Sequence, residues 1–385
     1  MSMTAIYFDH AATTPMHPEA IAAYAEAAGA GPGNPSSLHA YGRSSRSRLT
    51  SARDTLAGLL GCTAAELVFT GSGTESDNTA LFGAAAAQRA KGRTSIVTTA
   101  VEHHAVLKAC RQLEQQGYRL IVLPVDGEGR VSAADAAQAI DDSTALVSVM
   151  AGNNETGTLQ PYEEIGAIAR DRGALMHVDA VQAFGYSQWN LRHQPIDLLS
   201  LSAHKINGPQ GVGLLYVRKG TPFQPLLFGG TQERARRAGT ENVPGIAAFA
   251  AAAQIALHER DERVRHAEAI RNAFLQALRA EMPAEAFRLN GHPDQRLPHI
   301  ANISFPGCSA ESLLMNLDLE GVAASGGSAC TSGSLSPSHV LTAMGLPREI
   351  VKSTVRFSFG LGNTSEEAEK TAKITATIWA RIRIS

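Results

Sequence analysis

Residues 175–217 have the sequence LMHVDAVQAFGYSQWNLRHQPIDLLSLSAHKINGPQGVGLLYV. Three apolar runs in this stretch, at 175–179, 198–202 and 211–217, have the length and composition of β-strands. The first two are far enough apart for a crossover between parallel strands, whereas only a few residues separate the last two. We therefore predict that the last two runs form a hairpin, with Lys205 in the loop between its strands.

The segments on either side of this stretch predict an α/β fold. Apolar runs at 66–70, 95–99 and 145–150 are spaced by helix-length segments, which is typical of βαβ units around a mostly parallel sheet. Residues 244–282 have helical apolar spacing. They predict one long helix that links this sheet to a second domain.

The C-terminal part predicts a smaller α+β domain. We expect strands at 299–305 and 355–359, a helix at 310–319, and a last helix that begins with a T-x-x-E capping box from Thr364 to Glu367. The predicted domains are a large one over residues 13–260 and a small one over residues 261–385 together with 1–12.

The composition limits the classes of function. A chain of 385 residues with 44% hydrophobic and 18% charged residues can bury a large core. The formal net charge of -2 supplies no basic field, so we expect no direct nucleic-acid partner. No stretch reaches the ~18 apolar residues of a membrane span, and the first residues do not resemble a signal peptide. We therefore expect a cytoplasmic protein without a membrane partner.

The four cysteines are too few and too widely spaced for a zinc motif or a disulfide framework, so an important cysteine would act alone as a thiolate. Cys330 lies in the small-residue run SGGSACTSGS at 325–334, which we expect to be mobile and exposed. The alternative is an incidental surface cysteine. Cys62, Cys110 and Cys308 lie in apolar or helical sequence and are expected to pack as small hydrophobic side chains.

Three features suit a phosphorylated ring cofactor, although each also has a plainer interpretation. The GSGTES motif at 71–76 precedes a helix expected to begin near Asp77 and can cradle a phosphate, or form an ordinary turn. Asp179 ends a strand and can meet a ring nitrogen, or cap a helix. Lys205, one of only seven lysines, can form a Schiff base, or lie on a surface hairpin. Together they meet the requirements of pyridoxal phosphate.

Short motifs along some 350 residues extend this interpretation. In their joint order the chain resembles the class I cysteine desulfurases of the fold-type I pyridoxal-phosphate transferases, the branch associated with iron–sulfur cluster assembly. The motifs are YFDHAATT at 7–14, GNPSS at 33–37, TES at 74–76, EH at 102–103, NNE at 153–155, DAVQ at 179–182, SAHK at 202–205, GTEN at 239–242 and ACTSG at 329–333.

The resemblance implies roles for individual residues. Lys205 would hold the cofactor's aldehyde, Asp179 would pair with the ring nitrogen, and Gln182 would hydrogen-bond the ring hydroxyl. His103, with an unperturbed pKa of about 6.5, would stack on the ring and transfer protons, while Asn154 would support the ring. The implied phosphate contacts are Gly73, Thr74, Ser202, His204 and, from the second subunit of a homodimer, Thr240.

The resemblance also implies a substrate site and a reaction. Asn34 and Arg356 would hold the carboxylate of L-cysteine, for which a guanidinium gives a bidentate fit. Lys205 would take the α-proton, and the Cys330 thiolate would attack the substrate sulfur, which leaves a persulfide on Cys330 and L-alanine. An iron–sulfur scaffold, a tRNA-thiolation enzyme or another carrier would accept the sulfur, and Cys330 could transiently ligate a cluster shared with a scaffold.

Some positions depart from the family's pattern, and other functions remain open at this point. Gly73 stands where alanine is frequent, and Thr156 where isoleucine or valine often follows the NNE motif. Ile206 and Asn207 stand where an aromatic residue or another histidine often follows Lys205. The nearest alternatives are a selenocysteine lyase or an aminotransferase, which do not need Cys330. A non-catalytic assembly scaffold is the alternative from another class.

Overall fold

The computed structural model describes residues 5–326 and 337–383. Its largest element is a seven-stranded sheet in the order β2-β8-β7-β6-β5-β3-β4, in which only β8 runs antiparallel to its neighbours. This confirms the predicted mostly parallel sheet and the predicted hairpin of β7 and β8, and it adds the edge strand β4. The strands are β2 (Leu67–Thr70), β3 (Ser95–Thr99), β4 (Arg119–Leu123), β5 (Thr144–Ser148), β6 (Leu175–Asp179), β7 (Leu198–Ser202) and β8 (Gly213–Val217).

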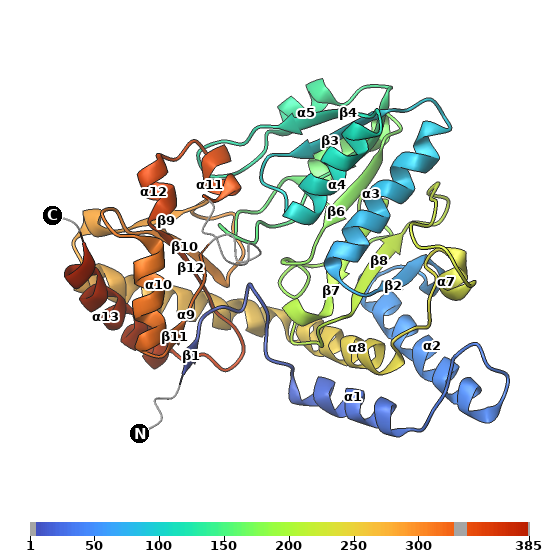
Figure 1. The fold of residues 1–385 in the computed structure, drawn as a ribbon, viewed down its shortest axis with the longest axis horizontal. Coiled ribbons are helices and arrows are strands. Elements are labelled where there is room, and N and C mark those ends of the chain that lie inside the picture. The colour runs from blue at the N-terminus through green and yellow to red at the C-terminus, as the bar shows by residue number, and fades with distance from the viewer. Residues whose placement is uncertain (1–4, 327–336, 384–385) are drawn as a thin grey trace.

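Helices cover both faces of this sheet (Figure 1). Successive side chains of a strand point to opposite faces, so Ile96 packs in one apolar cluster and Val97 in the other. The helices on one face are α3 (Gly73–Arg89) and α4 (His104–Gln115), and those in the cluster on the other face are α2 (Ala40–Leu60), α5 (Ala133–Ala139), α6 (Tyr162–Asp171) and α8 (Val243–His258).

A second, smaller set of strands and helices lies to the left of the large sheet in Figure 1. It contains an antiparallel sheet in the order β12-β10-β9 and the parallel pair β1–β11, around a separate apolar cluster that includes Phe8, Phe274 and Phe357. The predicted capping box is present, because the Thr364 hydroxyl accepts from the Glu367 N–H and the Glu367 carboxylate from the Thr364 N–H. These strands are β1 (Ile6–Tyr7), β9 (Arg288–Asn290), β10 (Ile300–Ser304), β11 (Val322–Ala323) and β12 (Thr354–Ser358).

The predicted single helix over 244–282 is wrong, because α8 ends at His258 and α9 (Arg260–Glu281) begins after a break at Glu259. The two helices have different neighbours: α8 packs on α1 (Pro18–Gly29) and α2, whereas α9 packs on α13 (Ser365–Ile382). The helical spacing of apolar residues resumes after Glu259, so the sequence pattern does not mark the break. The remaining helices are α7 (Gln232–Ala235), α10 (Ala310–Leu319), α11 (His339–Ala343) and α12 (Arg348–Lys352). Among the helices of the described ranges, none is both long and apolar enough to cross a membrane.

Candidate active site

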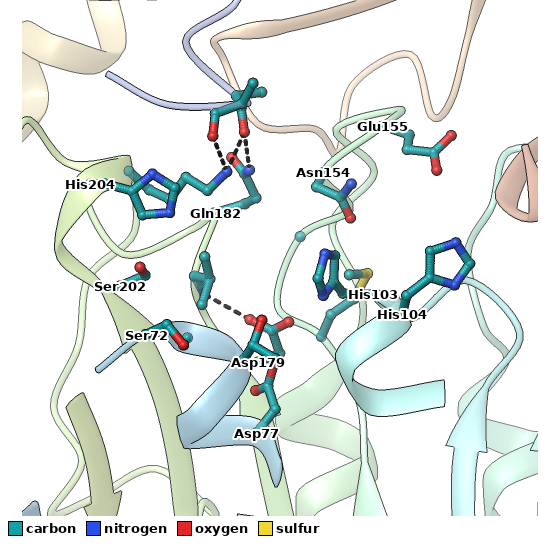
Figure 2. A pocket seen from close by; sticks show the side chains of 18 of the residues that line it. Ser72, Asp77, His103, His104, Asn154, Glu155, Asp179, Gln182, Ser202 and His204 are labelled. Carbon is teal, nitrogen blue, oxygen red and sulfur yellow. Dashed lines mark hydrogen bonds between the residues drawn. The ribbon is translucent and has the colours of Figure 1, made fainter. Parts of the chain in front are cut away.

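A cavity of about 270 Å³ lies at the carboxyl ends of β5, β6 and β7, the edge at which parallel sheets bind ligands (Figure 2). It is lined by residues from both parts of the structure. In the described chain Asn34 and Thr240 line no part of it, and Cys330 lies outside the described residues. The predicted site residues that do line the cavity are Gly73, Thr74, His103, Asn154, Asp179, Gln182, Ser202, His204, Lys205 and Arg356.

The β7–β8 hairpin brings Lys205 to this cavity. Lys205 ends a short 3-10 turn, Ala203–Lys205, that follows β7 directly. Its Nζ donates hydrogen bonds to the carbonyl oxygens of Ala11, at 2.6 Å, and Ala12, at 2.7 Å. The N-terminal segment therefore orients the amine within the cavity, which the sequence alone did not reveal.

Two buried carboxyl groups form the floor of the cavity. Asp179 ends β6, and Figure 2 shows the Asp77 side chain of α3 close beneath it, pointing toward it. Burial raises the pKa of Asp179 to about 6, against the opposing effects of the Val181 N–H and Lys205. Burial and the neighbouring Asp179 also hold the pKa of Asp77 well above its usual range. Such a floor fits a cationic ring nitrogen, which would share a proton with Asp179 or stabilise its anion.

Asp179 is not a helix N-cap, because residues 180–186 form hydrogen-bonded turns instead of an α-helix. Its Oδ1 accepts from the Val181 N–H at 2.9 Å, which fixes the carboxylate at the end of the strand.

The first turn of α3 forms another wall of the cavity. This helix begins at Gly73, with Ser72 as its N-cap, so the expected start near Asp77 is wrong by one turn. The GSGTES motif is therefore partly helical, and its first N–H groups face the cavity with the favourable end of the helix dipole. A Cβ at Gly73 would lie 2.8 Å from Val181 Cγ2, so glycine allows the close approach of these two segments. These features fit a phosphate group.

His103 stands at the N-terminus of α4, where its Nδ1 accepts from the Ala105 N–H at 3.2 Å. Its proton is therefore on Nε2 when the ring is neutral. Burial, together with the smaller effects of Lys205, His104 and His339, lowers the pKa of His103 to about 4. The ring is neutral near pH 7, whereas a histidine with an unperturbed pKa would be partly protonated. It can accept a proton only when a neighbouring cation is lost or an anion forms beside it.

Arg356 is buried in the cavity wall beside Asn154. Its NH1 donates to the Asn154 carbonyl oxygen at 2.8 Å and its NH2 to Asp9 Oδ1 at 3.0 Å. Its buried Nε has no hydrogen-bond partner among the described residues. A guanidinium that lines a cavity fits a carboxylate ligand. Asp9, which orients this guanidinium, was not identified from the sequence although it lies within the YFDHAATT motif.

Cavity residues also hold the chain on both sides of the undescribed residues 327–336. The Ser325 hydroxyl donates to Asp9 Oδ2 at 2.7 Å, and the Ser325 backbone pairs with that of Arg356. On the other side, the Ser338 hydroxyl donates to Glu155 at 2.5 Å. Both flanks of the segment that contains Cys330 are thus fixed at the cavity wall, a contact that the sequence analysis did not anticipate.

Asn34 and Thr240 lie in exposed segments instead. The Asn34 side chain accepts from the Ser36 N–H at 2.9 Å within a turn. Thr240 follows α7, where Glu233, Arg234 and Ala235 have φ values of 47°, 58° and 60°, the left-handed region that non-glycine residues rarely adopt. A left-handed turn of this kind requires strong contacts to persist.

Glu233 supplies such contacts from a buried position. Its carboxylate accepts two hydrogen bonds from Arg53, one of them at 2.9 Å, and one from the Phe69 N–H at 2.9 Å. We expect Glu233→Ala to lower the free energy of unfolding by about 3 kcal/mol, because it leaves Arg53 buried without its partner. Urea denaturation of the purified variant measures this loss.

Glu262→Ala is the matched control, since Glu262 pairs with Arg265 on the surface. Its expected loss is below about 0.5 kcal/mol. Equal stability of the two variants would contradict the account of the Glu233 contacts.

Comparison with known proteins shows which family the chain belongs to. Residues 6–371 match the family described as "Aminotransferase class-V". Over 381 residues the chain is 48% identical to a Bacillus subtilis (strain 168) protein that carries the name cysteine desulfurase IscS 1 provisionally, covering 99% of this chain and 100% of that protein. It is 45% identical to the cysteine desulfurase IscS of Methanosarcina thermophila, over 98% of this chain and 93% of that protein.

Comparison with solved structures agrees with the sequence comparisons. A solved structure described as a NifS-like protein superposes with a TM-score of 0.91 at 35% identity, covering 98% of this chain and 100% of the other. The predicted fold class is therefore confirmed.

Proposed function

The chain belongs to the aminotransferase class-V family and, within it, to the cysteine desulfurases, and on that premise we propose how its own residues carry out the reaction. It is a pyridoxal-phosphate-dependent enzyme that takes sulfur from L-cysteine and leaves L-alanine. The observation that carries the residue assignment is the shared cavity, in which the Lys205 amine, the Asp179 carboxyl and the first turn of α3 meet.

The residues that line this cavity would hold the cofactor. The first turn of α3, with Ser202 and His204, would bind the phosphate, Asp179 would pair with the ring nitrogen, and Lys205 would hold the aldehyde. When bound, pyridoxal phosphate supplies an electron sink for the bond that breaks at the α-carbon of the substrate. Asp179 is suited to its role because a cationic ring nitrogen would offset the burial that raises its pKa.

The remaining steps concern the substrate. Arg356 binds the carboxylate of L-cysteine through its guanidinium, while Asp9 and Asn154 keep the guanidinium in place. The Lys205 amine would take the α-proton. His103, neutral in the cavity and protonated on Nε2, donates a hydrogen bond from that atom or stacks on the ring without a charge of its own.

Cys330 is the proposed sulfur acceptor within the chain. Its thiolate attacks the substrate sulfur, the C–S bond breaks, and the three-carbon product takes up protons to become alanine. Cys330 lies five residues after Ser325, a chain length that spans at most about 18 Å. Since Ser325 is held at the cavity wall by Asp9, the thiol is within reach of the substrate.

Incubation with pyridoxal phosphate and L-cysteine tests this function. We expect alanine and sulfide in equal amounts in the presence of a reducing thiol. Alanine or pyruvate formed without modification of Cys330 would favour the selenocysteine lyase or aminotransferase alternative, and no product together with no cofactor uptake would favour a scaffold.

We also propose that the protein is a homodimer in which Thr240 and Asn34 complete the neighbouring subunit's site. Both residues lie outside the cavity of their own chain. Each is close in sequence to strongly exposed apolar side chains: Leu38, 83% exposed, follows Asn34, and Phe228, 86% exposed, precedes Thr240. Apolar side chains at such positions are typical of an interface.

Light scattering is expected to give the mass of a dimer. Phe228→Asp is expected to weaken dimerisation by about tenfold or more, because the variant would bury a charge in the interface. Leu319→Asp on α10 is the matched control, since Leu319 is 78% exposed on the smaller part of the structure. A monomer with full activity would contradict the assignment of Thr240 to the neighbouring site.

The finer assignments stay proposals. The division into residues 13–260 and residues 261–385 with 1–12 is supported by the two separate apolar clusters around the large and the small sheets. An iron–sulfur scaffold as the final acceptor, a transient cluster ligated by Cys330, and a cytoplasmic location remain predictions from the sequence.

A further inference from the structure

Gln182, the proposed partner of the ring hydroxyl, is held by two contacts. Its Nε2 donates to the Ala11 carbonyl oxygen at 2.8 Å, the same oxygen that accepts from Lys205 Nζ at 2.6 Å. Its Oε1 lies 3.3 Å from His299 Nε2. Because one hydrogen of Nε2 goes to Ala11, the other can be donated into the cavity that Gln182 lines.

The orientation of this amide determines the protonation of His299. The amide nitrogen must face the Ala11 carbonyl, so the amide oxygen faces His299, and an oxygen can only accept. His299 therefore carries its proton on Nε2. The ring is neutral, because burial and the nearby cations, Arg263 first among them, hold the pKa of His299 well below its usual range.

Two further side chains hold the His299 ring in place. The Tyr186 ring stacks on it at 4.1 Å with an interplanar angle of 9°, and the Arg263 guanidinium lies 4.8 Å from the centre of the Tyr186 ring. Arg263 also donates to Asn207 Oδ1 at 2.8 Å. Asn207 is the departure from the family pattern noted above; it is buried with φ 66° two residues after Lys205. Arg263 thus contacts both the His299 stack and the turn that carries Lys205.

We propose that His299 is a positioning residue for the desulfurase reaction: its Nε2–H fixes the Gln182 amide so that the amide nitrogen faces the cofactor. This inference rests on the proposed function, because it requires Gln182 to contact the cofactor. His299 precedes β10 of the small sheet and Gln182 follows β6 of the large one, so the contact also joins the two parts of the structure at the cofactor. Without the donor, the amide oxygen loses its partner and the Ala11 carbonyl alone holds the amide, so the amide nitrogen is less firmly oriented toward the cavity.

His299→Phe tests this directly, because phenylalanine keeps an aromatic ring for Tyr186 but has no donor. We expect the dissociation constant of pyridoxal phosphate to rise about tenfold, as for one lost buried hydrogen bond, and the absorption maximum of the bound cofactor to shift. His299→Gln, whose amide nitrogen can replace Nε2, is expected to stay within about threefold of the wild type. If His299→Phe does not fold, His299→Asn, with an amide too short to reach Gln182, takes its place.

A double-mutant cycle separates positioning from general stability. In a Gln182→Leu background, the substitution of His299 is expected to have no further effect on cofactor affinity. Additive losses, or wild-type affinity and spectrum in His299→Phe, would overturn the inference. If the wild-type protein itself binds no pyridoxal phosphate, or if Gln182→Leu binds it normally, the proposed function or the role of Gln182 fails instead.

Discussion

Lys205→Ala is expected to lower the rate of alanine formation from L-cysteine by about 10³-fold or more. The substitution removes both the amine that holds the cofactor covalently and the base that takes the α-proton. Reduction with borohydride followed by mass spectrometry should leave cofactor attached to the wild-type chain at Lys205 and none attached to the variant. The phosphate and ring contacts remain, so the variant should still bind the cofactor reversibly.

Lys219→Ala is the matched control, because Lys219 is exposed at the end of β8 and does not line the cavity. It should keep the wild-type rate and the covalent cofactor. A Lys205→Ala variant that keeps more than about a tenth of the activity would show that another group supplies the base.

Cys330→Ala is expected to bind the cofactor normally and to release sulfide at least about 100-fold more slowly, because the sulfur acceptor is missing. The other thiols cannot replace it. Burial raises the pKa of Cys62 to about 12 and that of Cys110 to about 12, and it also raises the pKa of Cys308. None of these three is a ready thiolate near pH 7.

Cys62→Ala is the control for this variant, since Cys62 is the most accessible of the three described cysteines. Its sulfide release should be unchanged. Unchanged turnover in Cys330→Ala would favour the selenocysteine lyase or aminotransferase alternative.

Local sequence signals predicted the frame of the site well. The hairpin at Lys205 could be predicted because its two strands are neighbours in the sequence. The position of Asp179 could be predicted because a polar residue ends a short apolar run. The capping box at Thr364 is equally local. The start of α3 was placed one turn late because Gly73 and Thr74 are weak helix formers, although Ser72 caps the helix and the cofactor site lies at its first turn.

Contacts between distant segments could not be predicted in this way. The Asp9–Arg356 pair joins residues 347 positions apart, and the carbonyl groups that accept from Lys205 lie more than 190 positions before it. The break at Glu259 likewise depends on which helices pack beside α8 and α9. Burial also lowers the pKa of His103 to about 4, which its unperturbed value of about 6.5 does not predict. The contacts of Asn34 and Thr240 could not be predicted from local sequence either, because their proposed partners would lie on a second copy of the chain.

The most direct test of the whole account is to map the sulfur after the reaction. The purified protein, loaded with pyridoxal phosphate, is given L-cysteine without a reducing thiol, alkylated, and analysed by mass spectrometry alongside Cys330→Ala. The account predicts one persulfide sulfur on Cys330 for each alanine formed, and none on Cys62, Cys110 or Cys308. Alanine formed while Cys330 stays unmodified, or a persulfide on another cysteine, would contradict it.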